Sequence, residues 1–141
     1  MPQRETDIAT VLRENGLSVT KQRLLIFETL EDREPLSMYE LYELVKGQLD
    51  RASLYRTITT FEKLGIVSRI NIGWKYKVEL SDQFAGHHHH LSCLGCGQVI
   101  PINENELESF IESLAKSHKF KPVEHQIELQ GYCDTCTNRS A

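Results

Sequence analysis

The sequence predicts an α+β fold with an N-terminal winged helix-turn-helix domain and a C-terminal α/β domain that holds a four-cysteine zinc site. Three observations predict it. Short amphipathic helix patterns follow one another up to residue 65, an alternating hairpin pattern comes next, and all four cysteines lie in two CxxC pairs farther on. We place the winged-helix domain at residues 1–81, a hinge at 82–86 and a metal-binding domain at 87–141.

The composition is that of a soluble globular protein, since 40% of the residues are hydrophobic and 26% are charged. No apolar run approaches the roughly 18 residues of a membrane span, and the N-terminus MPQRETDI has no signal-peptide pattern, so we expect a cytoplasmic protein. Residues 1–81 carry 12 basic and 12 acidic residues, whereas residues 82–141 carry 4 and 8, which together give the net charge of −4. The neutral N-terminal half is compatible with a nucleic-acid partner, and divalent cations can offset the acidic half.

Two amphipathic helices are expected first, one over residues 4–15 and one from the cap residue Thr20 to about Leu30. Thr20 and Arg23 at the start of the second helix offer a hydroxyl and a guanidinium to a phosphate, and the helix N-terminus adds to that attraction.

The third helix has the clearest start signal, because Ser37 and Glu40 have the spacing of a capping box. Its apolar positions continue at helical spacing from Met38 as far as Leu49, so we expect this helix to face a core.

Asp50 caps a fourth helix, which ends at Gly65. Leu54, Ile58 and Phe61 fall on one face of that helix and are expected to point inward. The opposite side presents small, hydroxyl and guanidinium side chains that suit a DNA major groove. These candidate DNA contacts are Ala52, Ser53, Tyr55, Arg56 and Thr59. A polar face that is merely solvated is the alternative.

Residues 66–72 and 74–80 alternate as two strands of a hairpin. In this pattern Trp74 joins the apolar face, and Lys75 and Lys77 lie on the other face. A hairpin directly after short helices is typical of a winged helix, which makes the polar face of the fourth helix a candidate recognition surface.

Four histidines at residues 87–90 run into Cys93. In a strand their side chains alternate, so His88 and His90 face one side while His87 and His89 face the other, and one strand could serve two metal sites. A purification tag is the alternative, although this run is internal.

The rest of the chain is expected to form a strand at 98–102, a helix at about 104–116 and a strand at 120–130. Glu108 lies at the edge of the helix's apolar face, where its carboxylate could reach a metal. His125 points with the apolar side of the last strand, either as a ligand or as a hydrogen-bonded core histidine.

The cysteines lie in the pairs Cys93/Cys96 and Cys133/Cys136. Two CxxC turns brought together supply the four thiolates of a tetrahedral structural Zn²⁺. Two disulfides or a redox dithiol are the alternatives. Neither fits well, because a CxxC disulfide closes a tight ring, no secretory signal is present and no thioredoxin-like βαβ pattern surrounds either pair.

Four segments of the sequence together resemble the Fur (ferric uptake regulator) family of metal-dependent repressors. GLSVTKQRLLIFETL resembles GLxxTxQRxxIL, RASLYRTI resembles ATVYRTL, HHHHLSCLGCGQVI resembles HxHHxxCxxCG, and HQIELQGYCDTC resembles HxxxxxGxCxxC. The resemblance implies a DNA-binding winged helix, a C-terminal dimerisation domain, a homodimer and a palindromic double-stranded operator.

The resemblance also implies three metal sites. Cys93, Cys96, Cys133 and Cys136 match the structural zinc ligands. Glu79, His88 and His90 match a sensory site at the hinge, for Fe²⁺ or Zn²⁺. His87, His89, Glu108 and His125 match a second site in the dimerisation domain, where His89 replaces the Asp of many relatives.

Two donors that relatives use at the sensory site are replaced by prolines, Pro35 and Pro101. Ser18 also replaces a basic residue that some relatives send into the minor groove. The loss of two donors favours a three-ligand or borrowed-ligand zinc or iron site over an iron-plus-peroxide mechanism.

We therefore expect a metal-responsive transcriptional repressor of metal-homeostasis genes and not an enzyme. A peroxide- or manganese-sensing member of the same family, or a zinc-ribbon interaction module without DNA binding, is the alternative. A zinc hydrolase or deaminase is disfavoured, because the sequence contains neither HExxH nor HxE with PCxxC.

Overall fold

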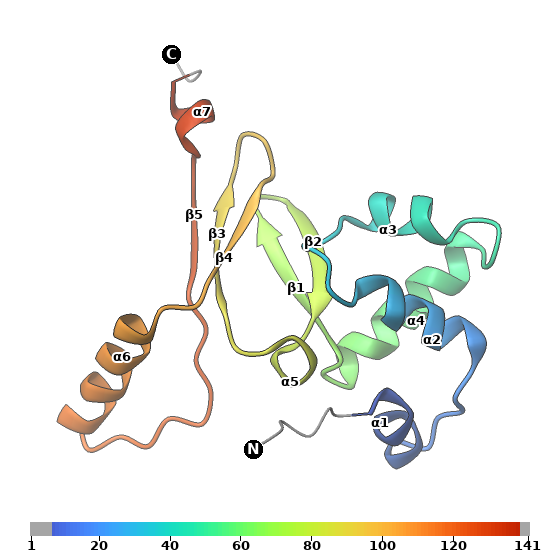
Figure 1. The fold of residues 1–141 in the computed structure, drawn as a ribbon, viewed down its shortest axis with the longest axis horizontal. Helices are drawn as coiled ribbons and strands as arrows, with labels where there is room; N and C mark the ends of the chain where they lie inside the picture. Colours follow the sequence, from blue (N-terminus) through green and yellow to red (C-terminus); the bar gives the residue numbers. More distant parts are fainter. Residues whose placement is uncertain (1–6, 139–141) are drawn as a thin grey trace. The chain divides into compact units, whose positions relative to one another are not determined.

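The computed structural model describes residues 7–138 and divides into two compact units, one through Gly86 and one from His87 onward (Figure 1). No helix within the described residues is both long and apolar enough to cross a membrane. The mixed α and β composition agrees with the predicted fold class.

The first unit contains helices and one hairpin. Its elements are α1 (Ile8–Glu14), α2 (Lys21–Leu30), α3 (Met38–Val45), α4 (Arg51–Lys63), β1 (Val67–Ile72), β2 (Lys75–Leu80) and α5 (Asp82–Ala85). The expected caps form: Thr20 and Asp50 accept hydrogen bonds from the backbone of α2 and α4, and Ser37 and Glu40 complete the capping box of α3.

One apolar core joins these elements. Leu12, Ile26, Leu41, Leu54 and Phe61, from the first four helices, are fully buried in it. Burying a side chain of this size contributes roughly 1.5–3 kcal/mol. The core therefore fixes α4 with its apolar face inward and its polar face outward, as the helical pattern predicts.

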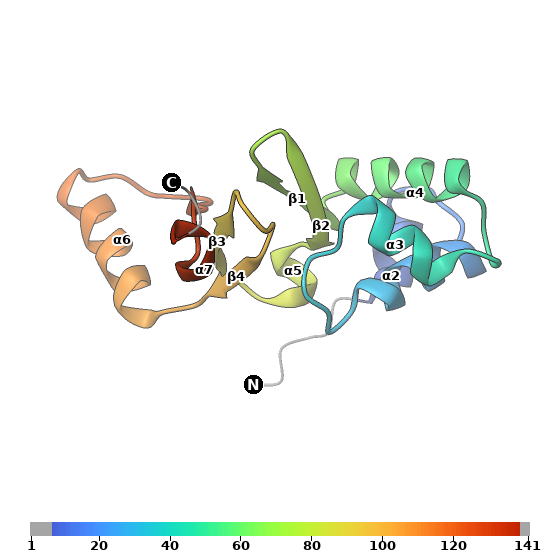
Figure 2. The same ribbon diagram turned by 90° about the horizontal axis from the view of Figure 1, so that it is seen from above.

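The hairpin packs beside α4 as a wing. β1 and β2 pair antiparallel, and Arg69 of β1 donates to Glu62 of α4 at 2.9 and 2.8 Å. Figure 2 shows the hairpin turn and α4 on the same side of this unit. The segment before α3 joins the wing through Leu36, whose backbone exchanges hydrogen bonds of 3.0 and 2.7 Å with Val78.

Three sequence expectations for this unit need correction. The first helix begins at Ile8, after the cap residue Asp7, and residues 4–6 of its expected range lie outside the described part of the chain. The third helix ends at Val45, so Leu49 reaches the core from the following turn. Trp74 does not join the apolar face: Ile72 pairs with Lys75, which leaves Trp74 in the turn and 90% exposed.

The second unit is a three-stranded sheet with strand order β4-β3-β5. Its elements are β3 (His89–Cys93), β4 (Val99–Ile102), α6 (Asn105–Ser117), β5 (Glu128–Gly131) and α7 (Asp134–Thr137). β4 is antiparallel to the central β3, and β5 is parallel to it. β4 returns the chain to the end of the sheet where β3 begins, and α6 with the segment after it then carries the chain to the opposite edge of β3, where β5 pairs.

The expected strand at 120–130 is wrong for most of its length. Only residues 128–131 pair with β3, and residues 120–127 form no strand. This segment leads the chain back from α6 to the sheet, so its alternating pattern does not correspond to backbone pairing.

Candidate functional site

The four cysteines come together at one end of the sheet. Cys93 ends β3 and Cys96 follows in the turn, while Cys133 caps α7 and Cys136 lies within it. Their Sγ atoms all lie within 4.8 Å of one another, and none of the four forms a disulfide. Four convergent thiols match the donor set of a tetrahedral zinc site.

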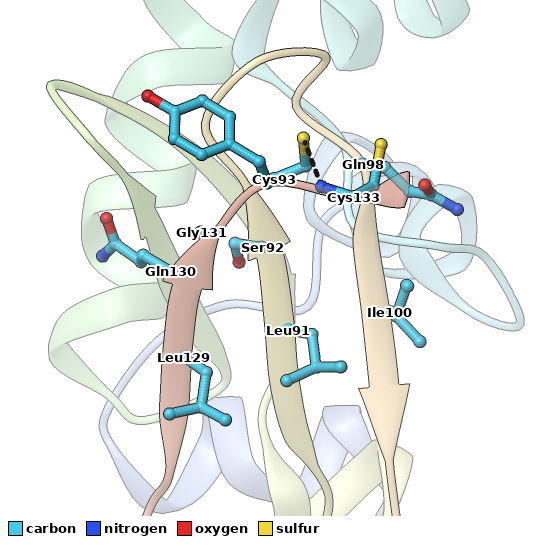
Figure 3. Close-up of a pocket in the computed structure, with 10 residues that line it drawn as sticks. Leu91, Ser92, Cys93, Gln98, Ile100, Leu129, Gln130, Gly131 and Cys133 are labelled. Carbon is cyan, nitrogen blue, oxygen red and sulfur yellow. Dashed lines mark hydrogen bonds between the residues drawn. The ribbon is translucent and has the colours of Figure 1, made fainter. Parts of the chain in front are cut away.

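The electrostatics of the cluster fit a bound cation. The backbone N–H of Cys133 donates to Cys93 Sγ at 3.3 Å (Figure 3), and the backbone N–H of Cys96 donates to the same sulfur at 3.5 Å. These hydrogen bonds lower the pKa of the Cys93 thiol to about 6. Contacts with the Cys133 and Cys93 sulfurs raise the pKa of Cys136 to about 12. The raised pKa of Cys136 disfavours its thiolate next to the other sulfurs, and a bound divalent ion would supply the positive charge that stabilises it.

Gly95 makes the close approach of the two CxxC segments feasible. A Cβ atom at this position would lie 2.8 Å from Cys136 Sγ and 2.9 Å from its Cβ. Any larger residue would push the second cysteine pair away from the first.

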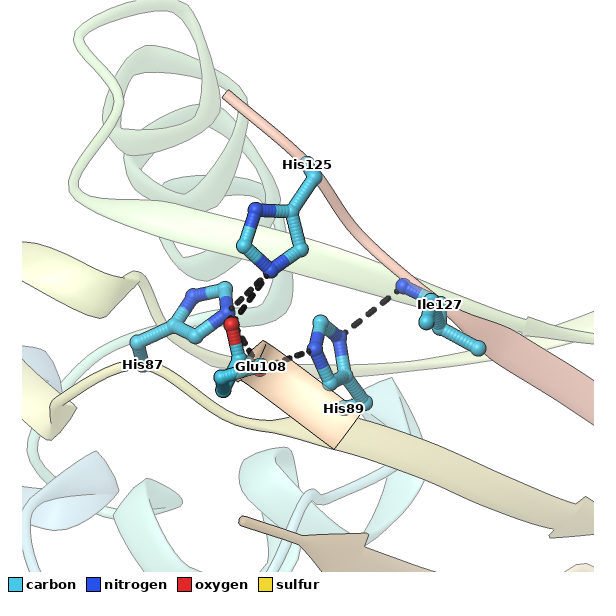
Figure 4. Close-up of polar contacts among 5 residues, drawn as sticks. All are labelled: His87, His89, Glu108, His125 and Ile127. Atoms are coloured by element: carbon cyan, nitrogen blue, oxygen red, sulfur yellow. Dashed lines mark hydrogen bonds and ion pairs between the residues drawn. The ribbon is translucent and has the colours of Figure 1, made fainter. Parts of the chain in front are cut away.

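A second cluster lies on one face of β3, where His87, His89 and His125 surround the Glu108 carboxylate (Figure 4). The Nε2 atoms of the three histidines lie 3.2, 2.6 and 2.7 Å from Glu108 oxygens, in that order. His87 Nε2 also lies 3.0 Å from His125 Nε2. Three imidazoles and one carboxylate that converge in this way suit Zn²⁺, Fe²⁺ or Mn²⁺.

The surroundings of the Glu108 carboxylate favour its charged form. Burial alone would raise the pKa of Glu108, but hydrogen bonds from His89 and His125 outweigh it and lower the pKa. A carboxylate that stays charged keeps its oxygens available to a cation.

His89 is held differently from the other two histidines. It is buried, and the backbone N–H of Ile127 donates to its Nδ1 at 3.0 Å. Nδ1 must then carry the lone pair, so the proton of the neutral ring lies on Nε2 and points to Glu108. A metal that binds at Nε2 has to displace this proton.

The three residues predicted for the sensory site, Glu79, His88 and His90, lie in both units. His88 and His90 have ring centroids 4.7 Å apart in the second unit, and His90 lies on β3. Glu79 lies on β2 of the first unit, paired in register with Ser68.

Four of the DNA-contact candidates line a depression of about 410 Å³ between the N-terminal parts of α2 and α4. Its lining residues are Thr20, Lys21, Gln22, Arg23, Ser53, Arg56, Thr57 and Thr60. Arg23 Nη1 donates to Ser18 O at 2.7 Å, and Arg56 Nη2 donates to Ser53 Oγ at 3.2 Å. Both guanidiniums are thereby held beside the hydroxyl groups that line the depression, an arrangement that suits a phosphate or base-edge partner.

The other predicted DNA contacts lie along the exposed side of α4. Ala52, Tyr55 and Thr59 are exposed, and Thr59 Oγ1 donates to Tyr55 O at 2.9 Å. The sequence prediction omitted Thr57 and Thr60, which line the depression. Thr57 and Thr60 follow Ser53 at i+4 and i+7, so helical spacing from the predicted contact Ser53 was the signal that could have identified them.

Comparisons with known proteins find the same family by sequence model and by individual relatives. The model described as "Ferric uptake regulator family" matches residues 14–130. A ferric uptake regulation protein of Yersinia pestis is 37% identical over 136 residues, which cover 92% of this chain and 90% of that protein.

Two solved structures are also similar. The Vibrio cholerae ferric uptake regulator is 33% identical with a TM-score of 0.74, and the match covers 90% of this chain and 100% of that one. A zinc-bound manganese uptake regulator is 32% identical with a TM-score of 0.65 over 88% and 96% of the two chains.

Proposed function

The chain belongs to the ferric uptake regulator family, and from this premise we propose that it is a dimeric repressor whose binding to operator DNA depends on a divalent metal. Metal-responsive transcription regulation is the function of the family. The observation that carries the proposal is the histidine strand: β3 and the residue before it present histidines on both faces, beside a cysteine cluster.

Cys93, Cys96, Cys133 and Cys136 would hold a permanent Zn²⁺. A closed four-thiolate site contributes to folding, because the ligands converge only in the folded chain. His87, His89, Glu108 and His125 would hold a second ion with nitrogen and oxygen donors, which exchange more readily than thiolates.

The sensory site is proposed at Glu79, His88 and His90, with Fe²⁺ or Zn²⁺ as the regulatory ion. A bound ion there would supply a bond between the wing strand and the histidine strand. Eight residues separate Glu79 from His88, so the two elements are close along the chain. The ligands would favour one arrangement of the two units only as far as they bind the ion better in that arrangement.

DNA would be bound by the polar face of α4. Arg56 and Tyr55 would reach base edges in the major groove, while Thr20 and Arg23 at the start of α2 would hold a phosphate. The hydroxyl and guanidinium groups that line the depression near Arg56 support this assignment.

A second copy of the chain would cover the apolar surface of the second unit. No residue of α6 is buried, and its Phe110 and Leu114 are 65% and 51% exposed. Leu91, Ile100 and Leu129 lie side by side across the sheet and line a groove of about 190 Å³ (Figure 3). Exposed apolar surface of this kind supports a homodimer.

The proposal is tested by selecting duplexes from a random DNA pool with the zinc-loaded protein and added Fe²⁺, Zn²⁺ or Mn²⁺. We expect a palindromic duplex to be selected and to bind more tightly with metal than without it. Equal affinity with and without added metal for every duplex would refute a metal-dependent regulator.

A further inference from the structure

His90 has a different neighbour on each side in the sheet. In register, His90 of β3 pairs with Pro101 of β4 and with Glu128 of β5. Pro101 offers no side-chain donor or acceptor, whereas the Glu128 carboxylate lies on the same face as the imidazole. Glu128 Oε1 is 3.6 Å from His90 Nδ1.

We propose that Glu128 is a positioning residue for His90: its carboxylate holds the proton of the imidazole on Nδ1 and so directs the Nε2 lone pair to the regulatory metal. This inference rests on the proposed metal site at His88 and His90. It assigns a role to Glu128 of β5, which supports the ligand His90 and is not itself one of the predicted ligands Glu79, His88 and His90.

The chemistry of histidine ligands supports this role. A neutral imidazole binds a metal through one nitrogen and keeps its proton on the other. A carboxylate at the protonated nitrogen fixes the tautomer, orients the ring and raises the basicity of the ligand nitrogen. Glu128 lies on the Nδ1 side, which leaves Nε2 as the metal-binding atom of His90.

The geometry requires a small adjustment. The distance of 3.6 Å is that of an ion pair and exceeds hydrogen-bond length, so rotation of the Glu128 side chain must close it. That side chain is 26% exposed, and its Oε1 otherwise accepts only a long 3.4 Å hydrogen bond from Gln126 Nε2 among the contacts described for it. The contacts described for Glu128 do not prevent this rotation toward His90.

The test compares wild type with Glu128→Ala and Glu128→Gln, each with zinc already in the cysteine cluster. Co²⁺ binding is measured by competition with a chelator, and His88→Ala identifies the binding step that belongs to the hinge. For that step we expect about 10–100-fold weaker binding in Glu128→Ala. Glu128→Gln should lie between, because its amide oxygen accepts a hydrogen bond but carries no charge.

Glu112→Gln is the matched control, since it removes one exposed carboxylate from α6. It should leave both Co²⁺ affinities unchanged. The step assigned to the other histidine cluster should stay unchanged in all Glu128 variants, which separates a local effect from a general loss of folding.

Two spectra test the positioning role itself. Long-range ¹H–¹⁵N NMR of the Co²⁺-free protein should show His90 protonated on Nδ1 in wild type and a mixture of tautomers in Glu128→Ala. X-ray absorption should show the same number of cobalt ligands in both. Unchanged Co²⁺ affinity or an unchanged tautomer would overturn the inference, as would the loss of one oxygen ligand, which would make Glu128 a direct ligand. If His88→Ala removes no binding step, the proposed hinge site itself fails.

Discussion

At the scale of single residues, the cysteine cluster makes a direct prediction. Cys136→Ser should lose the tightly bound zinc, because three thiolates and a hydroxyl cannot satisfy the site that four thiols form. Loss of zinc should lower the free energy of unfolding and dissociate the proposed dimer, since zinc binding and folding are coupled. Metal analysis and sedimentation measure both effects. A folded dimer with full zinc content would contradict the assignment.

Arg56→Ala should weaken operator binding and leave the metal content unchanged. If Arg56 reads a base, the loss should be about 1–3 kcal/mol and concentrated at one operator position. If it contacts a phosphate, the loss should be uniform across sequences and the salt dependence smaller by about one ion. Arg13→Ala, which removes an arginine at the end of α1, serves as the control. Equal affinities of the two variants would remove Arg56 from the interface.

Residue-scale prediction succeeded where the signal is local. CxxC spacing brings two sulfurs together by itself, so the meeting of the four cysteines needs only one tertiary contact. Trp74 was assigned wrongly, because alternation assigns faces but does not locate the turn. The Ile72–Lys75 pairing places Gly73 and Trp74 outside the ladder. Glu128 falls within the strand expected at residues 120–130, and only the register of β5 reveals its neighbour His90.

At the scale of elements, the capping box of α3 ties stability to pH. Ser37→Ala should cost about 1 kcal/mol of unfolding free energy, because the Glu40 N–H loses its acceptor at 3.1 Å. The Ser37 N–H, together with the Ser37 side chain and Lys77, lowers the pKa of Glu40 below its ordinary value of 4.5, although partial burial opposes this.

A lowered folded-state pKa sets the sign of the pH effect. The contribution of Glu40 is present above its ordinary pKa and is lost as the pH falls through the lower folded value. Urea unfolding at a series of acidic pH values should show this loss in wild type and not in Glu40→Gln, which keeps an acceptor oxygen without charge. An identical pH dependence in both would rule out the Glu40 contribution.

A tryptophan in the wing allows DNA contact at the hairpin turn to be measured by fluorescence. Trp74 is the single tryptophan of the chain and lies in the hairpin turn, with Lys75 Nζ 5.1 Å from its ring centre. Figure 2 shows this turn on the same side of the first unit as α4. If the wing contacts DNA beside α4, operator addition should change the tryptophan emission and reduce its quenching by acrylamide. Metal without DNA should change neither. Full accessibility of Trp74 in the DNA complex would exclude a contact at the turn.

Element prediction was most accurate for helices with a cap at the start. Thr20, Ser37 and Asp50 mark the starts of α2, α3 and α4 correctly, because side-chain capping is a local hydrogen bond. The end of α3 was missed, since Gly47 with a φ of 91° turns the chain while Leu49 still reaches the core. The strand at 120–130 was overextended, because pairing with β3 depends on where the crossover returns.

At the scale of the whole molecule, the proposed action of metal on DNA binding depends on the connection between the two units. α5 lies in the segment expected as a hinge, and its Phe84 packs edge-on against Phe27 of α2 at 5.0 Å between ring centres. The antiparallel bridge between Leu36 and Val78 would set Pro35 opposite Glu79, and proline has no donor for a metal. We therefore propose that Glu79 is the wing residue that connects the wing to the histidine strand through the metal ion.

The claim that metal at the hinge controls DNA binding is tested most directly by measuring the operator affinity of wild type and Glu79→Ala. The affinities are measured by fluorescence anisotropy with and without saturating metal. Wild type should bind the operator more tightly when metal is added. Glu79→Ala should lose this stimulation while its affinity without metal stays the same, and Glu108→Ala should retain it. Equal stimulation by metal in wild type and Glu79→Ala would show that metal at the hinge is not what controls DNA binding.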